Sequence, residues 1–244
     1  MSMPLAAICK GCWQKMGVPI PLGGVLSLPF RMFGIRRSRM NPNTCTICEL
    51  MFSRVMKARK VAVDVTVMFA DLRGYTSLSQ TLAPEAMSGL LDTFYDVCAT
   101  AIWEHDGLLN KTIGDAVMAV FNFPIPLENH ARQAVLTARA IQSRCHAQRE
   151  TLIADYGISG TELGVGIGID SGEVSFGEFG RSHRDLTAIG TVVNTAARAQ
   201  SAAAPGQILV TKSVFERSGP DMADSHVEEF RLKGFDAPMP LYTA

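Results

Sequence analysis

The sequence predicts an α/β sandwich, in which helices pack on a mixed β-sheet. After about residue 60, apolar segments typical of strands alternate with segments of helical periodicity. One strand segment folds back on itself at a glycine turn, which adds an antiparallel pair to the sheet. Apolar residues make up 47% of the 244 residues and charged residues 19%, a balance typical of a folded globular chain. These observations together indicate helices layered on a sheet.

The first half of the predicted domain contains a strand, a helix and a hairpin. The apolar run 65–72 predicts a buried strand. Residues 83–107 predict a helix, because Pro84 stands at its start, apolar residues follow at helical spacing and Gly107 ends it. Residues 108–121 predict a hairpin that turns at Gly114-Asp115.

The second half continues the alternation. The glycine-rich stretch 161–180 predicts a second hairpin, with its turn at Asp170-Ser171-Gly172. Its glycines lie within a strand rather than at the start of a helix, so they do not form a dinucleotide-binding fingerprint. The other expected elements are helices at 127–155 and 190–202, a strand at 206–212 and short strands around 227–233 and 239–243.

Residues 1–60 form a separate, basic segment, and the domain is expected to occupy residues 61–244. The segment holds ten lysines and arginines but one acid, Glu49, whereas the rest of the chain has an excess of acids. Such asymmetry suits docking on the acidic domain, on an anionic membrane surface or on nucleic acid, and the sequence leaves these open. Residues 47–60 predict a short helix that leads into the domain.

The longest early apolar run, residues 18–30, is interrupted by three prolines and is too short to cross a bilayer. It also lacks the pattern of a secretory signal. We therefore expect a cytoplasmic protein without a transmembrane span. No specific nucleic-acid partner is expected, and peripheral contact through the basic segment stays open.

Two carboxylates follow strand signals in this domain. Asp71 ends the first strand before a glycine turn, and Asp115 lies in the turn of the hairpin. A pair of acids at adjacent strand ends can hold two Mg²⁺ ions beside a phosphate chain, although an exposed strand edge with a charged turn would look similar. Asn194 and Arg198 lie four residues apart on one predicted helix, so they share a face and could bind a sugar oxygen and a phosphate.

Four stretches resemble, in order and spacing, the catalytic domain of class III nucleotidyl cyclases. They are VTVMFADLRGYTSLS, NKTIGDAVMAVF, GVGIGIDSGEVSFGEFG and TAIGTVVNTAARAQ. The resemblance covers about residues 62–243. It implies a ferredoxin-like cyclase fold that works as a homodimer, with two active sites at the subunit interface.

The resemblance also implies roles for individual residues. Asp71 and Asp115 match the ligands of two Mg²⁺ or Mn²⁺ ions, and the carbonyl of Leu72 matches a further metal contact. Asn194 and Arg198 match the pair that orients the ribose and stabilises charge at the α-phosphate. The turn that matches the triphosphate-holding loop consists of Gly74, Tyr75 and Thr76.

Lys111 matches the base-reading lysine of the family, and Thr187 stands where many members have an aspartate. A lysine can donate to a ring nitrogen of adenine and a threonine hydroxyl can accept from the exocyclic amine, so ATP is the expected substrate. Threonine here resembles a subgroup of bacterial adenylate cyclases. A second departure is Phe235, which aligns with a phosphate-binding lysine. The basic residues that could replace that lysine are Lys233, Arg181 and Arg184.

The basic segment contains two Cys-x-x-Cys pairs, Cys9 with Cys12 and Cys45 with Cys48. Four thiolates could bind zinc or a [2Fe–2S] cluster. The gap between the pairs is longer than a compact zinc module prefers, and a cluster would give a signalling enzyme a redox sensor, so we favour the cluster. Two unrelated pairs of reduced thiols remain the alternative.

We therefore expect an adenylate cyclase that converts ATP to 3′,5′-cyclic AMP and pyrophosphate and is regulated through its cysteine segment. The competing hypothesis is a non-catalytic sensor that binds ATP with the same fold while the cysteines read redox state. Loss of a metal-binding aspartate, Asn194 or Arg198 would have favoured the sensor, and all of these residues are present.

Overall fold

The computed structural model describes residues 5–80, 82–156, 163–180, 182 and 184–244. Its described residues form an eight-stranded sheet in the order β2-β3-β1-β4-β6-β8-β7, and β5 pairs with β4. β4 and β6 are parallel and the other pairs are antiparallel, so the sheet is mixed. The strands are β1 (Val61–Arg73), β2 (Leu108–Ile113), β3 (Ala116–Phe121), β4 (Gly164–Phe179), β5 (Asp185–Ile189), β6 (Ile208–Thr211), β7 (Val227–Phe230) and β8 (Met239–Thr243).

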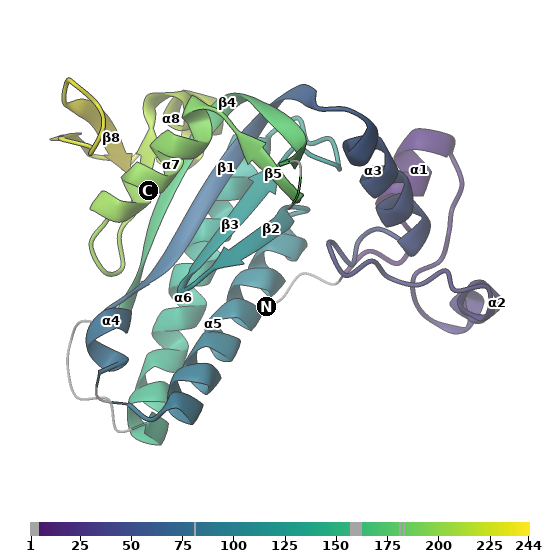
Figure 1. Cartoon of the computed structure of the whole chain (residues 1–244), viewed down its shortest axis with the longest axis horizontal. Helices are drawn as coiled ribbons and strands as arrows, with labels where there is room; N and C mark the ends of the chain where they lie inside the picture. Colours follow the sequence, from purple (N-terminus) through teal and green to yellow (C-terminus); the bar gives the residue numbers. More distant parts are fainter. Residues whose placement is uncertain (1–4, 81, 157–162, 181, 183) are drawn as a thin grey trace.

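Helices cover both faces of this sheet. The long helices α5 (Pro84–Glu104) and α6 (His130–Tyr156) lie side by side (Figure 1), and their apolar residues share one core cluster with Met68 and Ala70 of β1. Helix α7 (Thr191–Ala202) packs with Val67 of β1 in the other cluster. Successive residues of a strand point to opposite faces, which explains this division. The predicted α/β sandwich is confirmed.

The predicted second hairpin at 161–180 is wrong, because residues 164–179 form the single strand β4. Asp170, Ser171 and Gly172 continue the pairing with β1 without a turn. The buried carboxylate of Asp170 accepts hydrogen bonds from the Thr211 hydroxyl at 2.6 Å and the Ser171 amide at 2.7 Å. The polar residues that suggest a turn are therefore buried in the sheet, where hydrogen bonds satisfy the Asp170 carboxylate.

Gly168 of β4 determines how closely α7 approaches the sheet. A Cβ atom at this position would lie 2.0 Å from the amide nitrogen of Gln200 and 2.3 Å from the carbonyl oxygen of Ala196. Because only glycine leaves that space, it lets the helix backbone rest directly on the strand. The interpretation of these glycines as strand residues is confirmed.

Several other boundaries differ from the predictions. β1 begins four residues before the predicted strand, at Val61, and α5 ends at Glu104 rather than Gly107. The sequence patterns also missed strand β5. The remaining helical elements of the domain are α4 (Tyr75–Leu78), α8 (Lys212–Ser218) and the 3-10 helix η2 (Gly219–Met222).

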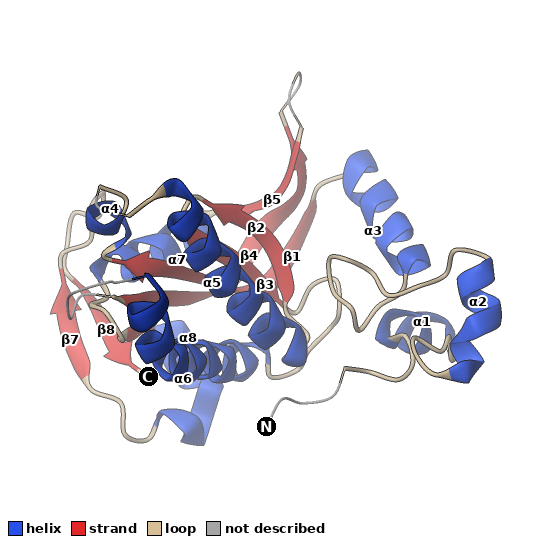
Figure 2. Cartoon of the chain, turned by 90° about the horizontal axis from the view of Figure 1, so that it is seen from below, coloured by secondary structure: helices blue, strands red, loops and turns tan. Residues whose placement is uncertain are grey.

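The N-terminal residues form a small module beside the sandwich (Figure 2). Its predicted helix at 47–60 is present as α3, and this helix ends just before β1. The module consists of α1 (Lys10–Met16), the 3-10 helix η1 (Val25–Ser27), α2 (Leu28–Met32) and α3 (Thr46–Ala58). Within the described part of the chain, no helix is both long and apolar enough to span a membrane.

Candidate active site

Asp71 lies near the end of β1, and its side chain is 17% exposed. Along β1, Val67 and Phe69 point to the face that α7 covers, and the strand alternation places Asp71 on that same face. Its carboxylate oxygen forms an ion pair with the guanidinium nitrogen of Arg73 at a distance of 3.2 Å. The predicted metal ligand is therefore half-buried and shares a sheet face with α7.

Asp115 lies beside Asp71, although 44 positions separate them in the sequence. The amide of Leu72 donates to the carbonyl oxygen of Asp115 at 3.2 Å, which joins the strand end to the hairpin turn. Gly114 permits this turn, because its φ is +60°. The hydroxyl of Tyr95 on α5 donates to the carbonyl of Gly114 and so ties the turn to this helix.

The two carboxylates interact electrostatically. Burial and, to a smaller extent, the charge of Asp115 raise the pKa of Asp71, Arg73 acts in the opposite direction, and the net value is about 6. Two acids that share a partly buried site repel each other unless a cation or a proton neutralises them. Carboxylate oxygens are the ligands that Mg²⁺ prefers, so the donor set fits a divalent cation.

Arg73 is a residue of this site that the sequence reasoning missed. Besides its ion pair with Asp71, its guanidinium donates to the carbonyl of Gln200 at the end of α7. The side chain lies over Gly166 of β4, where a Cβ would come within 2.4 Å of the arginine Nε. Only the strand pairing reveals this packing, because Gly166 and Gln200 are distant in sequence.

The turn predicted to hold the triphosphate follows directly after β1. Gly74 has a φ of +82° and begins the short helix α4, and its carbonyl accepts from the amide of Leu78 at 3.0 Å. The first amides of a helix have no partner within the helix. Tyr75 and Thr76 supply such amides close to Asp71 in the chain.

The predicted base-reading residues come from two neighbouring segments, β2 and β5. Lys111 forms an ion pair with Asp185, at the start of β5. The hydroxyl of Thr187 donates to the side-chain oxygen of Asn110 at 3.3 Å, and the amide nitrogen of Asn110 donates to the carbonyl of Leu186 at 2.9 Å. Lys111 and Thr187 therefore lie on segments that contact each other through Asp185 and Asn110, two residues that the motifs did not single out.

Asn194 and Arg198 lie on the exposed face of α7, as their spacing predicts. The buried face of the helix carries Val192, Ala196 and Ala199. Among the described residues, neither the Asn194 amide group nor the Arg198 guanidinium has a hydrogen bond or an ion pair within the chain. Both side chains are therefore available to a ligand or to a second subunit.

Phe235, which aligns with the phosphate-binding lysine of the family, has an apolar ring and cannot bind a phosphate in place of that lysine. Its ring packs against the small apolar cluster that contains Leu209 and Leu241. Among the proposed substitutes, Lys233 is exposed, and Arg184 is 3.7 Å from Glu178. Arg181 lies outside the described residues.

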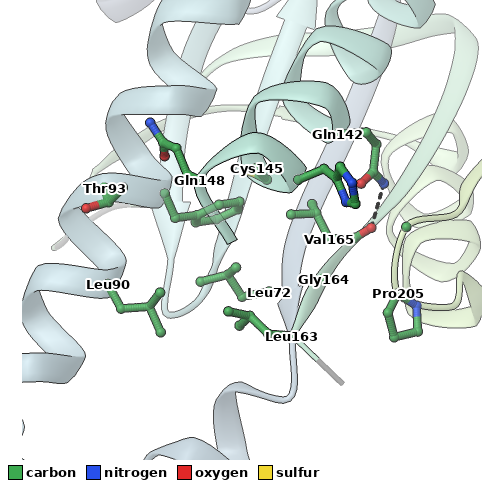
Figure 3. A pocket seen from close by; sticks show the side chains of 13 residues that line it. Leu72, Leu90, Thr93, Gln142, Cys145, Gln148, Leu163, Gly164, Val165 and Pro205 are labelled. Atoms are coloured by element: carbon green, nitrogen blue, oxygen red, sulfur yellow. Dashed lines mark hydrogen bonds between the residues drawn. The ribbon is translucent and has the colours of Figure 1, made fainter. Parts of the chain in front are cut away.

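A cavity of about 240 Å³ lies between α5, α6 and the beginning of β4 (Figure 3). Leu72 and Leu90 contribute to its apolar lining, and Gln142 donates to the carbonyl of Val165 at its edge. Leu72 belongs to the core cluster of α5 and α6, so its side chain points away from the face that carries Asp71. The cavity is therefore separate from the candidate active site.

The four N-terminal cysteines converge, although two loops and two helices separate the pairs. All four Sγ atoms lie within 4.8 Å of one another. The measured Sγ–Sγ distances are 3.6 Å for Cys9 and Cys48, 3.5 Å for Cys12 and Cys45, and 3.4 Å for Cys12 and Cys48. The alternative of two unrelated pairs does not explain this convergence.

The backbone around the cysteines is shaped to support sulfur ligands. The amides of Cys12 and Cys45 donate to the sulfur of Cys9 at 3.4 and 3.2 Å. Gly11 leaves room for the sulfur of Cys48, which a Cβ would approach to 2.8 Å. Hydrogen bonds from Cys48 and Cys9 lower the pKa of Cys45 to about 2, whereas burial raises that of Cys12 to about 12. Without a cation, the thiolate form of one cysteine thus disfavours the thiolate form of its neighbours. A bound cation would stabilise the thiolate form of all four.

The cysteine module contacts the turn between α5 and β2. The side-chain amide of Asn43 donates to the carbonyl of Trp103 at 2.8 Å and to the carboxylate of Asp106 at 2.7 Å. Asn41 donates to the carbonyl of Gly107 at 2.9 Å, and Lys10 forms an ion pair with Asp106. The module therefore holds the residues that directly precede β2.

Comparison with known proteins supports the cyclase fold that the sequence motifs predict. The sequence profile of the adenylate and guanylate cyclase catalytic domain matches residues 58–243. The chain is 33% identical over 187 residues to an adenylate cyclase of Anabaena cylindrica, covering 73% of this chain and 36% of that protein. It is 32% identical over 136 residues to adenylate cyclase 1 of Rhizobium meliloti, covering 55% of this chain and 20% of that protein. The chain thus spans between a fifth and about a third of these relatives.

Solved structures agree. The adenylyl cyclase CyaB from P. aeruginosa superposes with a TM-score of 0.69 at 29% identity, covering 76% of this chain and 95% of that one. The guanylyl cyclase Cya2 gives the same TM-score at 26% identity and covers 75% and 92% of the two chains. The chain belongs to the family of adenylate and guanylate cyclase catalytic domains.

Proposed function

We propose that the protein is an adenylate cyclase that converts ATP to 3′,5′-cyclic AMP and pyrophosphate. The observation that carries this proposal is the pair of acids Asp71 and Asp115. They lie close together at the end of β1, where the amide of Leu72 donates to the backbone carbonyl of Asp115. The ribose 3′-hydroxyl gives up its proton to solvent and attacks the α-phosphorus, so a bond from the 3′-oxygen to phosphorus forms while the bond from the α-phosphorus to the bridging oxygen breaks and pyrophosphate leaves. Asp71, Asp115 and the Leu72 carbonyl would hold two Mg²⁺ or Mn²⁺ ions. Bound there, these ions would neutralise phosphate charge and acidify the attacking hydroxyl.

The other residues would position the nucleotide. The amides of Gly74, Tyr75 and Thr76 suit the oxygens of the triphosphate. Asn194 would orient the ribose, and Arg198 would donate to the α-phosphate as negative charge develops. Both are free of partners in the described chain, which is consistent with these roles.

The contacts of Thr187 favour adenine over guanine. Asn110 donates to the carbonyl of Leu186, so its side-chain oxygen faces Thr187 and accepts a hydrogen bond from the Thr187 hydroxyl, for which the carbonyl of Ala188 at 3.4 Å is a second acceptor. The threonine oxygen is then left with lone pairs only, and it can accept from the exocyclic amine of adenine. The corresponding oxygen of guanine would meet another acceptor. Lys111 would complete recognition by donating to a ring nitrogen, after it leaves Asp185.

We further propose a homodimer with two composite sites. The family resemblance assigns the metal ligands and the base-reading and transition-state residues to different subunits. In the single chain, the exposed face of α7 that carries Asn194 and Arg198 has no partner among the described residues, which is consistent with a second copy facing it.

A direct assay tests the proposed activity. The purified chain, shown to be dimeric, would be incubated with ATP or GTP and Mg²⁺ or Mn²⁺, and cyclic nucleotide and pyrophosphate would be quantified. We expect equal amounts of cyclic AMP and pyrophosphate, with ATP preferred over GTP. A dimer that binds ATP but forms no product with either metal would support the non-catalytic sensor instead.

We also propose that the four cysteines hold one tetrahedrally coordinated ion, for which zinc is the best candidate. With Zn–S bonds of about 2.3 Å, sulfurs around one tetrahedral ion lie about 3.8 Å apart. The described distances of 3.4–3.6 Å approach this spacing. A [2Fe–2S] cluster divides its thiolates between two irons, so some sulfurs must lie much farther apart. The geometry therefore favours zinc over the cluster that the sequence pattern favoured.

This ion would regulate the enzyme through the turn that precedes β2. Asn41 and Asn43 are almost fully buried and bond to residues 103–107, and β2 follows with Asn110 and Lys111. If metal loss unfolds the module, the hydrogen bonds of Asn41 and Asn43 break. The residues before β2, the strand that carries Lys111, are then no longer held in place. Such a link changes activity without touching a catalytic residue.

A further inference from the structure

The N-terminal module exposes a compact group of large apolar side chains. They lie on η1 and α2 and are Val25, Leu26, Leu28, Met32 and Phe33, with exposed fractions of 80%, 78%, 54%, 88% and 86%. We name these five residues the apolar tip. Contiguous exposed apolar groups of this kind mark binding sites for other molecules or for membranes.

The tip is an ordered turn rather than a loose loop. The amide and hydroxyl of Ser27 both bond to the carbonyl of Gly24, at 3.1 and 2.7 Å. At the other end, the amide of Ile35 donates to the carbonyl of Phe30 at 2.9 Å. Ile20 and Ile35, on either side of the tip, pack against the cysteine cluster. The cysteine module therefore presents the apolar side chains on a fixed support.

The position of the tip leaves it free to meet a surface. In both views α2 lies at the outer end of the module, away from the sheet and from α5 and α6 (Figures 1 and 2). The module docks on the catalytic domain through Lys10, Asn41 and Asn43, which lie outside the tip. Contact at the tip thus does not compete with docking.

The charge around the tip selects an anionic partner. Residues 1–48 contain six basic residues and no acid. Arg31 lies within α2, and Arg36 and Arg39 follow it on exposed positions. Apolar side chains that protrude between arginines match the boundary of a lipid bilayer, where the arginines meet anionic headgroups and the tip enters the acyl region.

We propose that the apolar tip inserts into an anionic membrane surface and carries the cyclase domain to it. The early apolar run 18–30, which is too short to span a bilayer, supplies Val25, Leu26 and Leu28 of the tip, and a peripheral role explains why these side chains are exposed. The proposal does not depend on cyclase activity, because it rests on the N-terminal module alone.

Sedimentation of the full chain with lipid vesicles tests this proposal. We expect it to bind vesicles of phosphatidylcholine with phosphatidylglycerol far more strongly than vesicles of phosphatidylcholine alone. The variant Leu26→Ser/Met32→Ser/Phe33→Ser should bind anionic vesicles about 1,000-fold more weakly, because each of the three apolar side chains that enter the membrane contributes roughly a tenfold effect. Arg31→Gln/Arg36→Gln should reduce the preference for anionic lipid.

A matched variant on α3 serves as the control. Leu50, Met51 and Val55 are also exposed, at 53%, 53% and 40%, and their replacement by serine should leave vesicle binding unchanged. Metal content and circular dichroism of every variant would verify that the module is folded. Absence of vesicle binding by the wild-type chain, or binding by the tip variant at the wild-type level, would refute the proposal. So would a tip variant that loses dimerisation in gel filtration, because the tip would then be a contact between copies.

Discussion

The amide of Leu72 donates to the carbonyl oxygen of Asp115 at 3.2 Å, so the end of β1 and the turn of the β2–β3 hairpin meet at one point. This bond places Asp115 close enough to raise the pKa of Asp71. A strand end and a hairpin turn, distant in sequence, thereby form one acidic site.

Replacement of either acid should abolish cyclase activity without unfolding the chain. Asp71→Ala and Asp115→Ala each remove a carboxylate that a divalent cation needs, and we expect at least about a 1,000-fold loss of kcat. Activity assays and gel filtration would measure both effects. Asp96→Ala, a change at an exposed acid of α5, should keep wild-type activity. Near-normal turnover by either site variant would refute the two-metal assignment.

Asp71 should make the metal-free protein less stable as the pH rises. Its folded-state pKa is raised to about 6, above the unfolded value near 3.9, so the folded state holds the proton more tightly. Stability therefore falls between about pH 4 and pH 6, by up to about 3 kcal/mol, and the penalty persists above pH 6. Asp71→Asn should thus raise the unfolding free energy at pH 8 and change it little at pH 4.

Urea denaturation in the presence of a chelator would measure this effect, with Asp96→Asn as the control. Adding Mn²⁺ at pH 8 should stabilise the wild-type chain and leave the Asp71→Asn variant almost unchanged, because binding to the folded state alone shifts the equilibrium. Equal pH profiles for the wild type and Asp71→Asn would show that Asp71 is not a perturbed acid.

Two inactive variants should complement each other. If Asp71 and Arg198 act in one composite site from different subunits, a mixture of Asp71→Ala and Arg198→Ala chains forms heterodimers with both changes in one site. The other site is then intact. Random mixing makes half of the dimers heterodimeric, so activity should return to roughly a quarter of the wild-type value. Heterodimers that form but remain inactive would exclude a shared interface site.

Asn110 should control the choice between ATP and GTP. In Asn110→Ala the Thr187 hydroxyl loses the nearer of its two acceptors and keeps only the carbonyl of Ala188 at 3.4 Å, so it becomes freer to donate to guanine as well as accept from adenine. We expect the ratio of kcat/KM for ATP over GTP to fall about tenfold, which corresponds to one hydrogen bond. Thr187→Ser, which keeps the hydroxyl, should preserve the ratio. An unchanged ratio in Asn110→Ala would show that this contact does not orient the hydroxyl.

Each of the four cysteines should be needed for the bound ion. Each of the single changes Cys9→Ser, Cys12→Ser, Cys45→Ser and Cys48→Ser leaves an incomplete set of thiolates, so most of the bound metal should be lost. Elemental analysis of the purified chain should find about one zinc per subunit, without the visible absorption of an iron–sulfur cluster. Cys145→Ser should keep the metal, because that cysteine lies on α6 outside the cluster. Wild-type protein that contains iron and inorganic sulfide would reverse the choice of metal.

The sequence by itself determined most of the elements and the catalytic motif. Helical spacing placed Asn194 and Arg198 on one face of α7, and the Gly114-Asp115 turn predicted the hairpin. These features depend on backbone preferences and on residues a few positions apart, which a linear pattern records. The order of four motifs then identified the family, and the resemblance predicts roles for Asp71 and Lys111.

Only the tertiary structure decided which distant groups satisfy one another. Asp170 reads as a turn residue until its buried partner Thr211 is known, and Arg73 has no evident role until Gln200 and Gly166 lie beside it. The meeting of the two cysteine pairs in space is likewise visible only in the tertiary structure. Hydrogen bonds and metal geometry depend on ångström distances between segments far apart in the chain, and local sequence preferences do not encode those distances.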